Sequence, residues 1–351
     1  MDARWMAEAI GEAAETRPHP NPRVGALVID RNGDLLAVSS HVGVGEPHAE
    51  VAALRHAGPR AAGGTLYTTL EPCVHFGRTP PCVAAIIDSG VGRVVIGSVD
   101  PDPRVDGRGV AALEEAGIEV TVGVLSEQVE ASDRAYFHHR RFGRPLVTLK
   151  AALTLDGQLA ASDGSSQWIT LRETRRDAHR LRSEADGVVI GAGTLRADNP
   201  RLTVRLESYS DPQPTPVVVL GRQPVPPDAA LLHRHDLLVV SPIEQPEIEA
   251  RTLVVPDEMG GRVDLQKAVE LLGEEGLLDL LVEGGSAIFK SLLDAGLADR
   301  LIVYLGGKVA GGRGLPLFDG TFETLSDATA WRISDATLLG TDLRLTAYPA
   351  P

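Results

Sequence analysis

Two periods of hydrophobic residues alternate along residues 1–143. Apolar residues that recur every three or four positions are typical of amphipathic helices, and short apolar runs between turn residues are typical of strands. Residues 23–29 and 35–42 are two such runs separated by an Asn-Gly turn, which predicts a β-hairpin. This succession predicts a sheet sandwiched by helices. Helices are expected at 2–16, 48–58, 81–90, 109–117 and 126–145, and further strands at 65–70, 93–99 and 118–124.

A second alternating series follows a plausible hinge at residues 143–145, where the sequence reads Gly-Arg-Pro. It predicts a second α/β domain, so that the chain divides into residues 1–143 and 144–351. Strands are expected at 146–155, 187–195, 216–221, 237–241 and 252–256, a helix at 173–185, a strand, glycine turn and helix over 277–296, and more β structure at 300–314 and 332–348.

Composition and charge narrow the class of protein. Hydrophobic residues make up 43% of the chain, but no apolar run approaches the ~20 residues of a membrane span. The first 20 residues resemble an ordinary amphipathic helix and not a secretion signal, so we expect a cytoplasmic protein without a membrane partner. The net charge is −14, and residues 1–145 hold 19 acids against 14 arginines. A nucleic-acid partner is therefore not expected, because such proteins need a cationic surface.

Both cysteines of the chain, Cys73 and Cys82, lie in one loop rich in proline and glycine. In a cytoplasmic protein such a pair indicates metal binding or catalysis. A catalytic Zn²⁺ takes three protein ligands and keeps one position open for water, and His48 is the third candidate ligand. Glu50 is placed to take a proton from that water and pass it to a departing amine. The order H-x-E, then P-C and a further cysteine, is the signature of zinc-dependent base deaminases.

Other interpretations of these residues are open. The cysteines could be small buried core residues, or they could hold a structural zinc whose fourth ligand would be His75. A nucleic-acid base deaminase would share the same zinc core, but the acidic balance disfavours it. A non-catalytic zinc module would have no use for Glu50. The preferred hypothesis is a zinc hydrolase with one zinc per chain that acts on an amino-substituted ring of a small molecule.

The spacing of the cysteines narrows the family. The deaminase signature places two residues between them, whereas eight intervene here. Together with HPNPRVG (19–25) and DPDPRVDGRG (100–109), the run EPCVHFGRTPPC (71–82) resembles the bifunctional riboflavin-biosynthesis deaminase/reductase family. The resemblance implies a cytidine-deaminase-like, three-layer α/β/α domain that acts on a diamino-pyrimidinone bearing a ribosylamino 5′-phosphate. It also implies a pyrimidine and phosphate pocket lined by Asn21, His41, His75 and Arg78.

Lys150 is the first lysine of the chain and lies inside the apolar pattern of residues 146–155. Only four of the 34 basic residues are lysine, so arginine supplies most of the surface charge. A single lysine that faces a core or cleft is better explained by chemistry than by solubility. The alternative is an edge-strand lysine that protects against aggregation.

The motifs that follow Lys150 resemble the reductase half of the same family. They are TLDGQLA (154–160), DGSSQWIT (163–170), GAGTLRADNPRLTVR (191–205) and LLVEGGSAIFKSLL (280–293). The Gly-Gly turn in the last motif suits a cofactor phosphate at a helix N-terminus, but it is not the Rossmann fingerprint. The resemblance implies a dihydrofolate-reductase-like α/β domain that takes hydride from NADPH and reduces the ribosylamino group to ribitylamino. It also implies a homo-oligomer that assembles through the reductase half.

Lys150 and Asp198 are the candidates for polarising or protonating the anomeric region. Arg182 and Arg205 suit a phosphate dianion, because an arginine side chain can bind it with two parallel hydrogen bonds. Matching the motifs position by position then assigns a cofactor group and a substrate group. By resemblance, NADPH is held by Ala152, Trp168, Thr194, Asp198 and the stretch Gly285–Ser291, which includes Ser286 and Ala287. By the same resemblance, the substrate is held by Ser166, Arg182, Leu202, Arg205 and Glu283.

Three positions depart from the family pattern. Gln158 stands where arginine or lysine is expected, and Leu220 and Gly221 stand where aspartate and serine are common. The second departure removes a side-chain contact to NADPH and leaves the choice of NADPH over NADH open. An alternative is therefore an active deaminase whose second half binds a ligand without reducing it. The glycine-rich stretch 306–314 could be a hairpin or a phosphate cradle.

Overall fold

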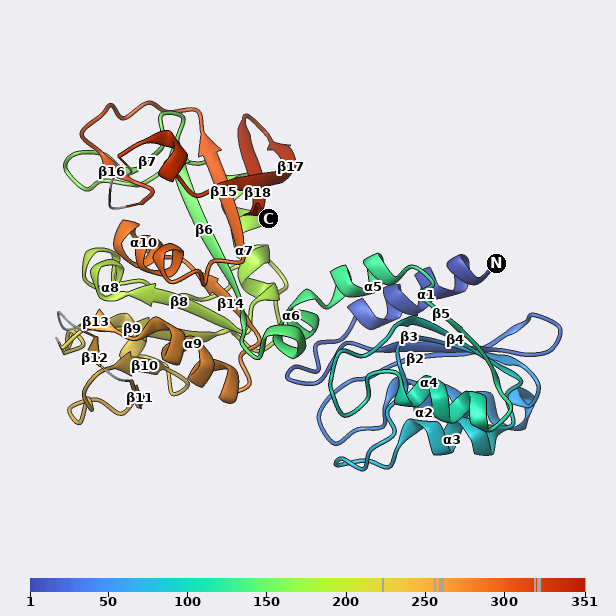
Figure 1. Cartoon of the computed structure of the whole chain (residues 1–351). Coiled ribbons are helices and arrows are strands. Elements are labelled where there is room, and N and C mark those ends of the chain that lie inside the picture. The colour runs from blue at the N-terminus through green and yellow to red at the C-terminus, as the bar shows by residue number, and fades with distance from the viewer. Residues whose placement is uncertain (223, 256, 259–261, 319, 321–322, 351) are drawn as a thin grey trace. The chain divides into compact units, whose positions relative to one another are not determined.

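The computed structural model describes residues 1–222, 224–255, 257–258, 262–318, 320 and 323–350. The chain divides into two compact units, Met1–Arg144 and Pro145–Pro351 (Figure 1). Among the described residues, none of the helices has both the length and the apolar character that crossing a membrane requires. Pro256, the last residue of the strand expected at 252–256, lies outside the described residues.

The first unit is a three-layer α/β/α domain, as the sequence predicts. Its five-stranded sheet has the order β2-β1-β3-β4-β5, with α1 and α5 over one face and α2, α3 and α4 over the other (Figure 1). The expected hairpin of β1 and β2 is present and antiparallel. The elements are α1 (Asp2–Ala14), β1 (Gly25–Ile29), β2 (Leu35–Ser40), α2 (Ala49–Ala57), β3 (Thr65–Leu70), α3 (Cys82–Ser89), β4 (Arg93–Ser98), α4 (Arg108–Glu115), β5 (Glu119–Val122), α5 (Ser126–Ser132) and α6 (Arg134–Phe142).

The helix expected at 126–145 is two helices, α5 and α6, which meet at Asp133. This residue leaves the helical region, with φ −135° and ψ 51°. Its carboxylate accepts a hydrogen bond from the backbone N–H of Arg23 at 2.7 Å and lies 2.9 Å from His19 Nε2. At this break the Asp133 side chain is bound to the segment before β1, outside both helices.

The second unit is built on a nine-stranded sheet with the order β11-β10-β9-β8-β14-β6-β15-β18-β17. The strands from β11 to β15 are parallel, and β18 and β17 are antiparallel. The elements are β6 (Leu146–Thr154), β7 (Gln158–Ala160), α7 (Arg172–Glu184), β8 (Gly187–Gly191), α8 (Ala192–Asp198), β9 (Thr215–Val219), β10 (Leu238–Ser241), β11 (Arg251–Val254), β12 (Asp257–Glu258), β13 (Arg262–Val263), α9 (Leu265–Glu274), β14 (Asp279–Val282), α10 (Ser286–Asp294), β15 (Arg300–Gly306), β16 (Leu315–Pro316), β17 (Trp331–Leu339) and β18 (Asp342–Pro349).

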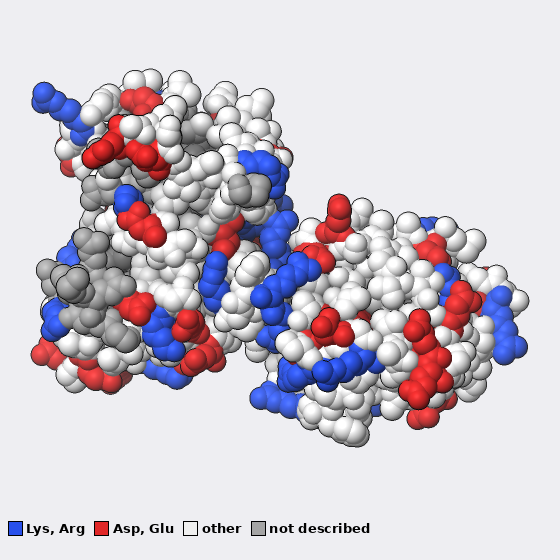
Figure 2. All heavy atoms as spheres, in the orientation of Figure 1, with Lys and Arg blue, Asp and Glu red and all other residues white. Residues whose placement is uncertain are grey.

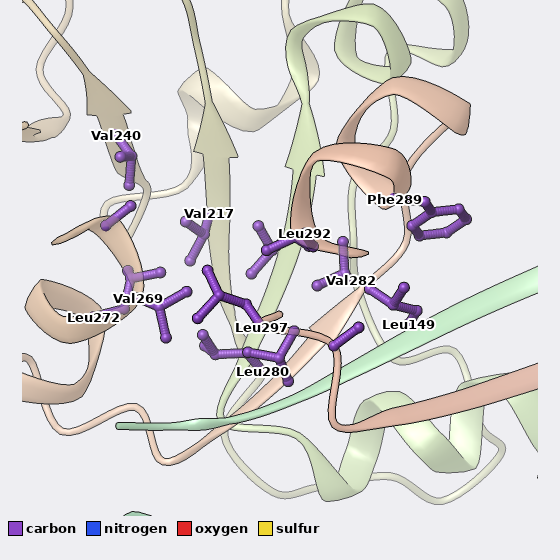
Figure 3. Close-up of a cluster of buried hydrophobic side chains, with 14 of the residues drawn as sticks. Leu149, Val217, Val240, Val269, Leu272, Leu280, Val282, Phe289, Leu292 and Leu297 are labelled. Atoms are coloured by element: carbon purple, nitrogen blue, oxygen red, sulfur yellow. The ribbon is translucent and has the colours of Figure 1, made fainter. Parts of the chain in front are cut away.

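Alternate residues of the central strands pack on opposite faces of this sheet. Leu149, Leu280 and Val282 pack with Leu272 and Phe289, which come from α9 and α10 (Figure 3). On other strand positions, side chains join the separate apolar clusters of α7 and α8. The strand expected at 187–195 ends at Gly191, where α8 begins. Both faces of the central strands are therefore covered, which is why these strands read as continuous apolar runs.

Candidate zinc and reductase sites

Three side chains that the sequence selects as zinc ligands converge in the first unit. His48 directly precedes α2, Cys73 follows β3, and Cys82 opens α3. His48 Nδ1 lies 3.0 Å from Cys82 Sγ and 3.6 Å from Cys73 Sγ, and the two sulfur atoms are 3.5 Å apart. This donor set fits a zinc ion with one position left open. Among the described residues, the group of side chains that could hold a metal ion does not include His75, the fourth ligand that a structural zinc would need.

The two thiols differ in acidity. Hydrogen bonds from the Cys82 and His48 side chains hold the pKa of Cys73 far below that of a free thiol. The hydrogen bond to Cys73 and burial raise the pKa of Cys82. The Cys82 backbone N–H, at the start of α3, also lies 3.4 Å from the Cys73 sulfur. The helix start therefore favours the Cys73 thiolate, and zinc binding would ionise both sulfurs.

Glu50 has the environment of an acid–base catalyst. It lies on the first turn of α2, and only 3% of the residue is exposed. Burial raises its pKa to about 7, and its Oε2 atom has no hydrogen-bond partner among the described residues. A carboxyl group with a pKa near the working pH can both take up and release a proton.

Two of the expected pocket residues, Asn21 and His41, lie together beside the zinc ligands. His41 Nδ1 lies 3.1 Å from the Pro47 carbonyl oxygen, and its Nε2 lies 2.9 Å from Asn21 Nδ2. Because a carbonyl only accepts, Nδ1 carries the hydrogen and Nε2 accepts from the Asn21 amide. Burial lowers the pKa of His41, which keeps the ring neutral. The other two, His75 and the exposed Arg78, lie in the loop between the cysteines.

A buried carboxylate that the sequence pattern does not single out lies at the base of the cysteine loop. Glu71 accepts four backbone N–H groups, from Asp100, Gly107, Gly109 and Val110, at 2.8–3.2 Å. These bonds tie the loop after β4 and the first turn of α4 to the base of the loop that carries the cysteines. A Cβ atom on Gly109 would lie 2.2 Å from the Pro72 carbonyl oxygen, so the contact requires glycine. The acid in EPC is visible in the sequence, but its partners are not.

The second unit contains a cavity of about 1510 Å³. The residues named for NADPH or for the reductase substrate, from Lys150 to Ala287, contribute to its lining, whereas Phe289, inside the stretch Gly285–Ser291, is buried in the apolar core. The Gly-Gly turn after β14 and the start of α10 also line it. The structure therefore brings together segments that are more than 130 positions apart in the chain.

Lys150 lies at the cavity in an interior strand, because β6 is flanked by β14 and β15. The edge-strand interpretation is therefore wrong. Its side chain is 15% exposed, and Nζ lies 3.4 Å from Glu283 Oε2. Arg182 binds both oxygens of the same carboxylate and donates to the Thr203 carbonyl at 2.8 Å. Burial opposes ionisation of Glu283, but the charges of Lys150 and Arg182 outweigh it and hold its pKa below the ordinary value.

Arg205 also lines this cavity and lies close enough to Arg182 for the two charges to repel each other. Burial and the nearby Arg182 charge lower its pKa, whereas Arg182 itself is bound by Glu283. A dianion placed beside Arg205 would relieve this repulsion. Its role and that of Arg182 in phosphate binding remain predictions.

Two stretches whose structure the sequence leaves open are residues 306–314 and the pair Leu220-Gly221. Residues 307–314 contain no strand and lead from β15 to β16, which pairs with β7, so this stretch does not form a hairpin. The amides of Ala310 and Gly311 donate to the Asp156 carboxylate at 3.0 and 2.7 Å, which reduces their capacity to bind a phosphate. Leu220 is fully buried in an apolar cluster, and Gly221 lines the cavity without a side chain.

Comparisons with known proteins agree with a zinc site in the first unit and a reductase cavity in the second. Residues 1–98 match the family model of the cytidine and deoxycytidylate deaminase zinc-binding region, and residues 145–345 match that of the RibD C-terminal domain. The riboflavin biosynthesis protein RibD of Aquifex aeolicus is 39% identical, over 98% of this chain and 97% of its own, and that of Escherichia coli is 36% identical, over 98% of each.

Solved structures give the same result over the whole chain. A RibD structure from Acinetobacter baumannii superimposes with a TM-score of 0.91 at 32% identity and covers 99% of both chains. A diaminohydroxyphosphoribosylaminopyrimidine deaminase/5-amino-6-(5-phosphoribosylamino)uracil reductase from Thermotoga maritima superimposes with a TM-score of 0.89 at 32% identity and covers 99% of both. The chain therefore belongs to the RibD family of riboflavin-biosynthesis enzymes, which join a zinc-dependent deaminase domain to a reductase domain.

Proposed function

We propose that the chain catalyses two consecutive reactions of riboflavin biosynthesis. The first unit replaces the 2-amino group of 2,5-diamino-6-(5-phosphoribosylamino)pyrimidin-4(3H)-one by oxygen. The second unit reduces the ribosyl group to give 5-amino-6-(5-phosphoribitylamino)uracil. The observation that carries this proposal is the convergence of His48, Cys73 and Cys82 beside the buried Glu50. The cavity that gathers all the reductase motifs supports the second step and disfavours a non-reducing second half.

In the deaminase unit, Glu50 moves the protons. Zinc, when bound by His48, Cys73 and Cys82, supplies the Lewis acid that activates a water molecule. Glu50 takes a proton from the attacking water and delivers it to the departing amine. Asn21 and His41 hold the pyrimidine ring, and His75 and Arg78 bind the phosphate side of the substrate. Because both cysteines must act as thiolates, the same proposal places the chain in the reducing cytoplasm.

In the reductase unit, charge positions the substrate. When bound, NADPH would supply the hydride, and the start of α10, with Gly285 and Ser286, would hold its phosphates. Arg205 binds the substrate phosphate, with Arg182 held beside it by Glu283. Lys150 and Asp198 are the two candidates for the proton donor. The pKa of Asp198 is raised by burial, which would help this carboxyl group to carry a proton.

The product masses test both steps. The zinc-loaded protein is given the diamino-pyrimidinone ribosyl phosphate with and without NADPH, and the products are weighed by mass spectrometry. We expect exchange of an amine for oxygen without NADPH, and a gain of two hydrogens only with it. Amine loss alone would contradict the reductase step, and an unchanged substrate in both samples would contradict the whole proposal.

We also propose that the chain forms a homo-oligomer through the reductase unit. In the described sheet, β17 is an edge strand, and its Ile333 and Leu338 are 61% and 72% exposed. A long edge strand with exposed apolar side chains is a template for pairing with another chain. On the face that Figure 2 shows, acidic and basic side chains of each unit are interspersed with uncharged surface.

The oligomer is tested by substitution on β17. The double variant Ile333→Lys/Leu338→Lys is expected to be a monomer in light scattering, because two charges on the edge disfavour pairing. Ile243→Lys is the matched control, since Ile243 is an exposed apolar residue near β10, towards the other end of the same sheet. A monomeric wild type, or a double variant that still assembles, would contradict this proposal.

A further inference from the structure

The loop between the two cysteines contacts the zinc ligand His48 from the side away from the sulfur atoms. His48 Nδ1 faces both cysteines, whereas its second ring nitrogen, Nε2, lies 3.1 Å from Thr79 Oγ1. Thr79 therefore occupies the position from which a side chain can set the orientation of a metal-binding imidazole.

The chemistry of the ring fixes the direction of this hydrogen bond in the zinc-loaded state. A ligating imidazole nitrogen must be free of hydrogen, so coordination through Nδ1 leaves the proton of the neutral ring on Nε2. Nε2 then donates and the Thr79 hydroxyl accepts. Without this acceptor, the ring could rotate or carry its proton on Nδ1, and both changes oppose metal binding.

The backbone of the loop holds Thr79 in place. At the base, the Val83 N–H donates to the Cys73 carbonyl at 3.3 Å, and at the tip the Gly77 N–H donates to the Thr79 carbonyl at 3.2 Å. Pro80 follows directly and restricts the Thr79 backbone to extended conformations. The eight residues between the cysteines therefore form a closed loop whose threonine side chain reaches His48.

We propose that Thr79 is a positioning residue of the zinc site, which fixes the tautomer and the ring orientation of His48. The proposal rests on the assignment of His48, Cys73 and Cys82 as zinc ligands. It gives the enlarged loop a second task besides carrying Arg78. Arg78 is expected to bind the substrate phosphate, and Thr79, the next residue of the same loop, contacts the metal ligand His48.

The test compares a substitution that removes the hydroxyl group of Thr79 with one that keeps it. Thr79→Val keeps the branched shape and removes the acceptor, whereas Thr79→Ser keeps the acceptor. Zinc affinity of each metal-free protein is measured by competition with a chromogenic chelator. We expect Thr79→Val to bind zinc about 10–100-fold more weakly than the wild type, and Thr79→Ser to bind it about as tightly. Equal affinities of Thr79→Val and wild type, or equal losses in both variants, would overturn the proposal.

A measurement on the wild type makes the test independent of how the variants fold. Nitrogen-15 NMR of the histidine rings in the zinc-loaded full chain is expected to show His48 with hydrogen on Nε2 and zinc on Nδ1. The reverse tautomer would overturn the role of Thr79 while leaving the deaminase intact. A wild type that binds no zinc would instead overturn the ligand assignment, so the two failures are distinguishable.

Discussion

Glu50→Gln is expected to lower the rate of amine release by about 10²–10⁴-fold, the range that general acid–base catalysis supplies, while zinc binding is retained. The substitution keeps the size of the side chain but removes the group that carries a proton between water and amine. Glu50 lies outside the three-ligand group, so the donors to zinc are unchanged. Amine release would be followed by mass spectrometry of the product, and zinc content by elemental analysis.

Two controls separate a chemical effect from a general one. Glu114→Gln changes an exposed acid on α4 and is expected to deaminate like the wild type. The reductase step of Glu50→Gln, measured on the deaminated substrate with NADPH, is also expected to be unchanged. A Glu50→Gln protein that deaminates at the wild-type rate would refute the assigned role, and one that loses its zinc would show that Glu50 supports the ligands.

The zinc site could be predicted from the sequence because its chemistry depends on residue types at fixed spacings. His48 and Glu50 are two positions apart at a helix start, and the cysteines flank one loop, so local spacing alone suggests the group. The break at Asp133 could not be predicted in the same way. At the break, Asp133 accepts a hydrogen bond from the Arg23 backbone, 110 positions away, and a local sequence pattern contains no information about such a partner.

The supports of the zinc site were missed for the same reason. The partners of Glu71 are backbone amides 29–39 positions further along the chain. Because almost every residue has a backbone N–H, residue types do not identify these donors. Thr79 was visible as part of FGRTPPC, but only the folded loop shows that its hydroxyl faces His48. Residue types identify the groups that react, whereas the groups that orient them emerge from the fold.

In the second unit, composition alone points to Lys150 but not to its partners. The scarcity of lysine predicts that Lys150 has a chemical role, and the interior position of β6 agrees with that interpretation. The carboxylate that pairs with Lys150 could not be located from the sequence, because Glu283 lies 133 positions away, directly after β14. Arg182 was expected to meet a phosphate, yet Glu283 and the Thr203 carbonyl already accept from its guanidinium. These three charged groups therefore act as one unit.

Glu283→Gln is expected to destabilise the reductase unit by about 3–5 kcal/mol, the usual cost of removing one partner from a buried ion pair. The carboxylate is 12% exposed and is the common partner of Lys150 and Arg182, so the variant leaves two cations at the cavity without their counter-charge. Hydrogen exchange of the β6 and β14 backbone in the full chain measures the free energy of opening locally. Glu184→Gln, an exposed acid on α7, is the control and is expected to change it by no more than about 0.5 kcal/mol.

The destabilisation caused by Glu283→Gln should become smaller as the pH falls. Because Lys150 and Arg182 lower the pKa of Glu283 in the folded chain, its charge stabilises the fold at neutral pH. This contribution is fully present above the ordinary glutamate pKa of about 4.3 and declines as the pH falls below it, because the unfolded chain then takes up a proton that the folded chain does not. The gap in opening free energy between wild type and Glu283→Gln should therefore narrow in acid. A gap that widens there, or a variant that opens no more readily than Glu184→Gln at neutral pH, would show that Glu283 does not hold the two cations in place.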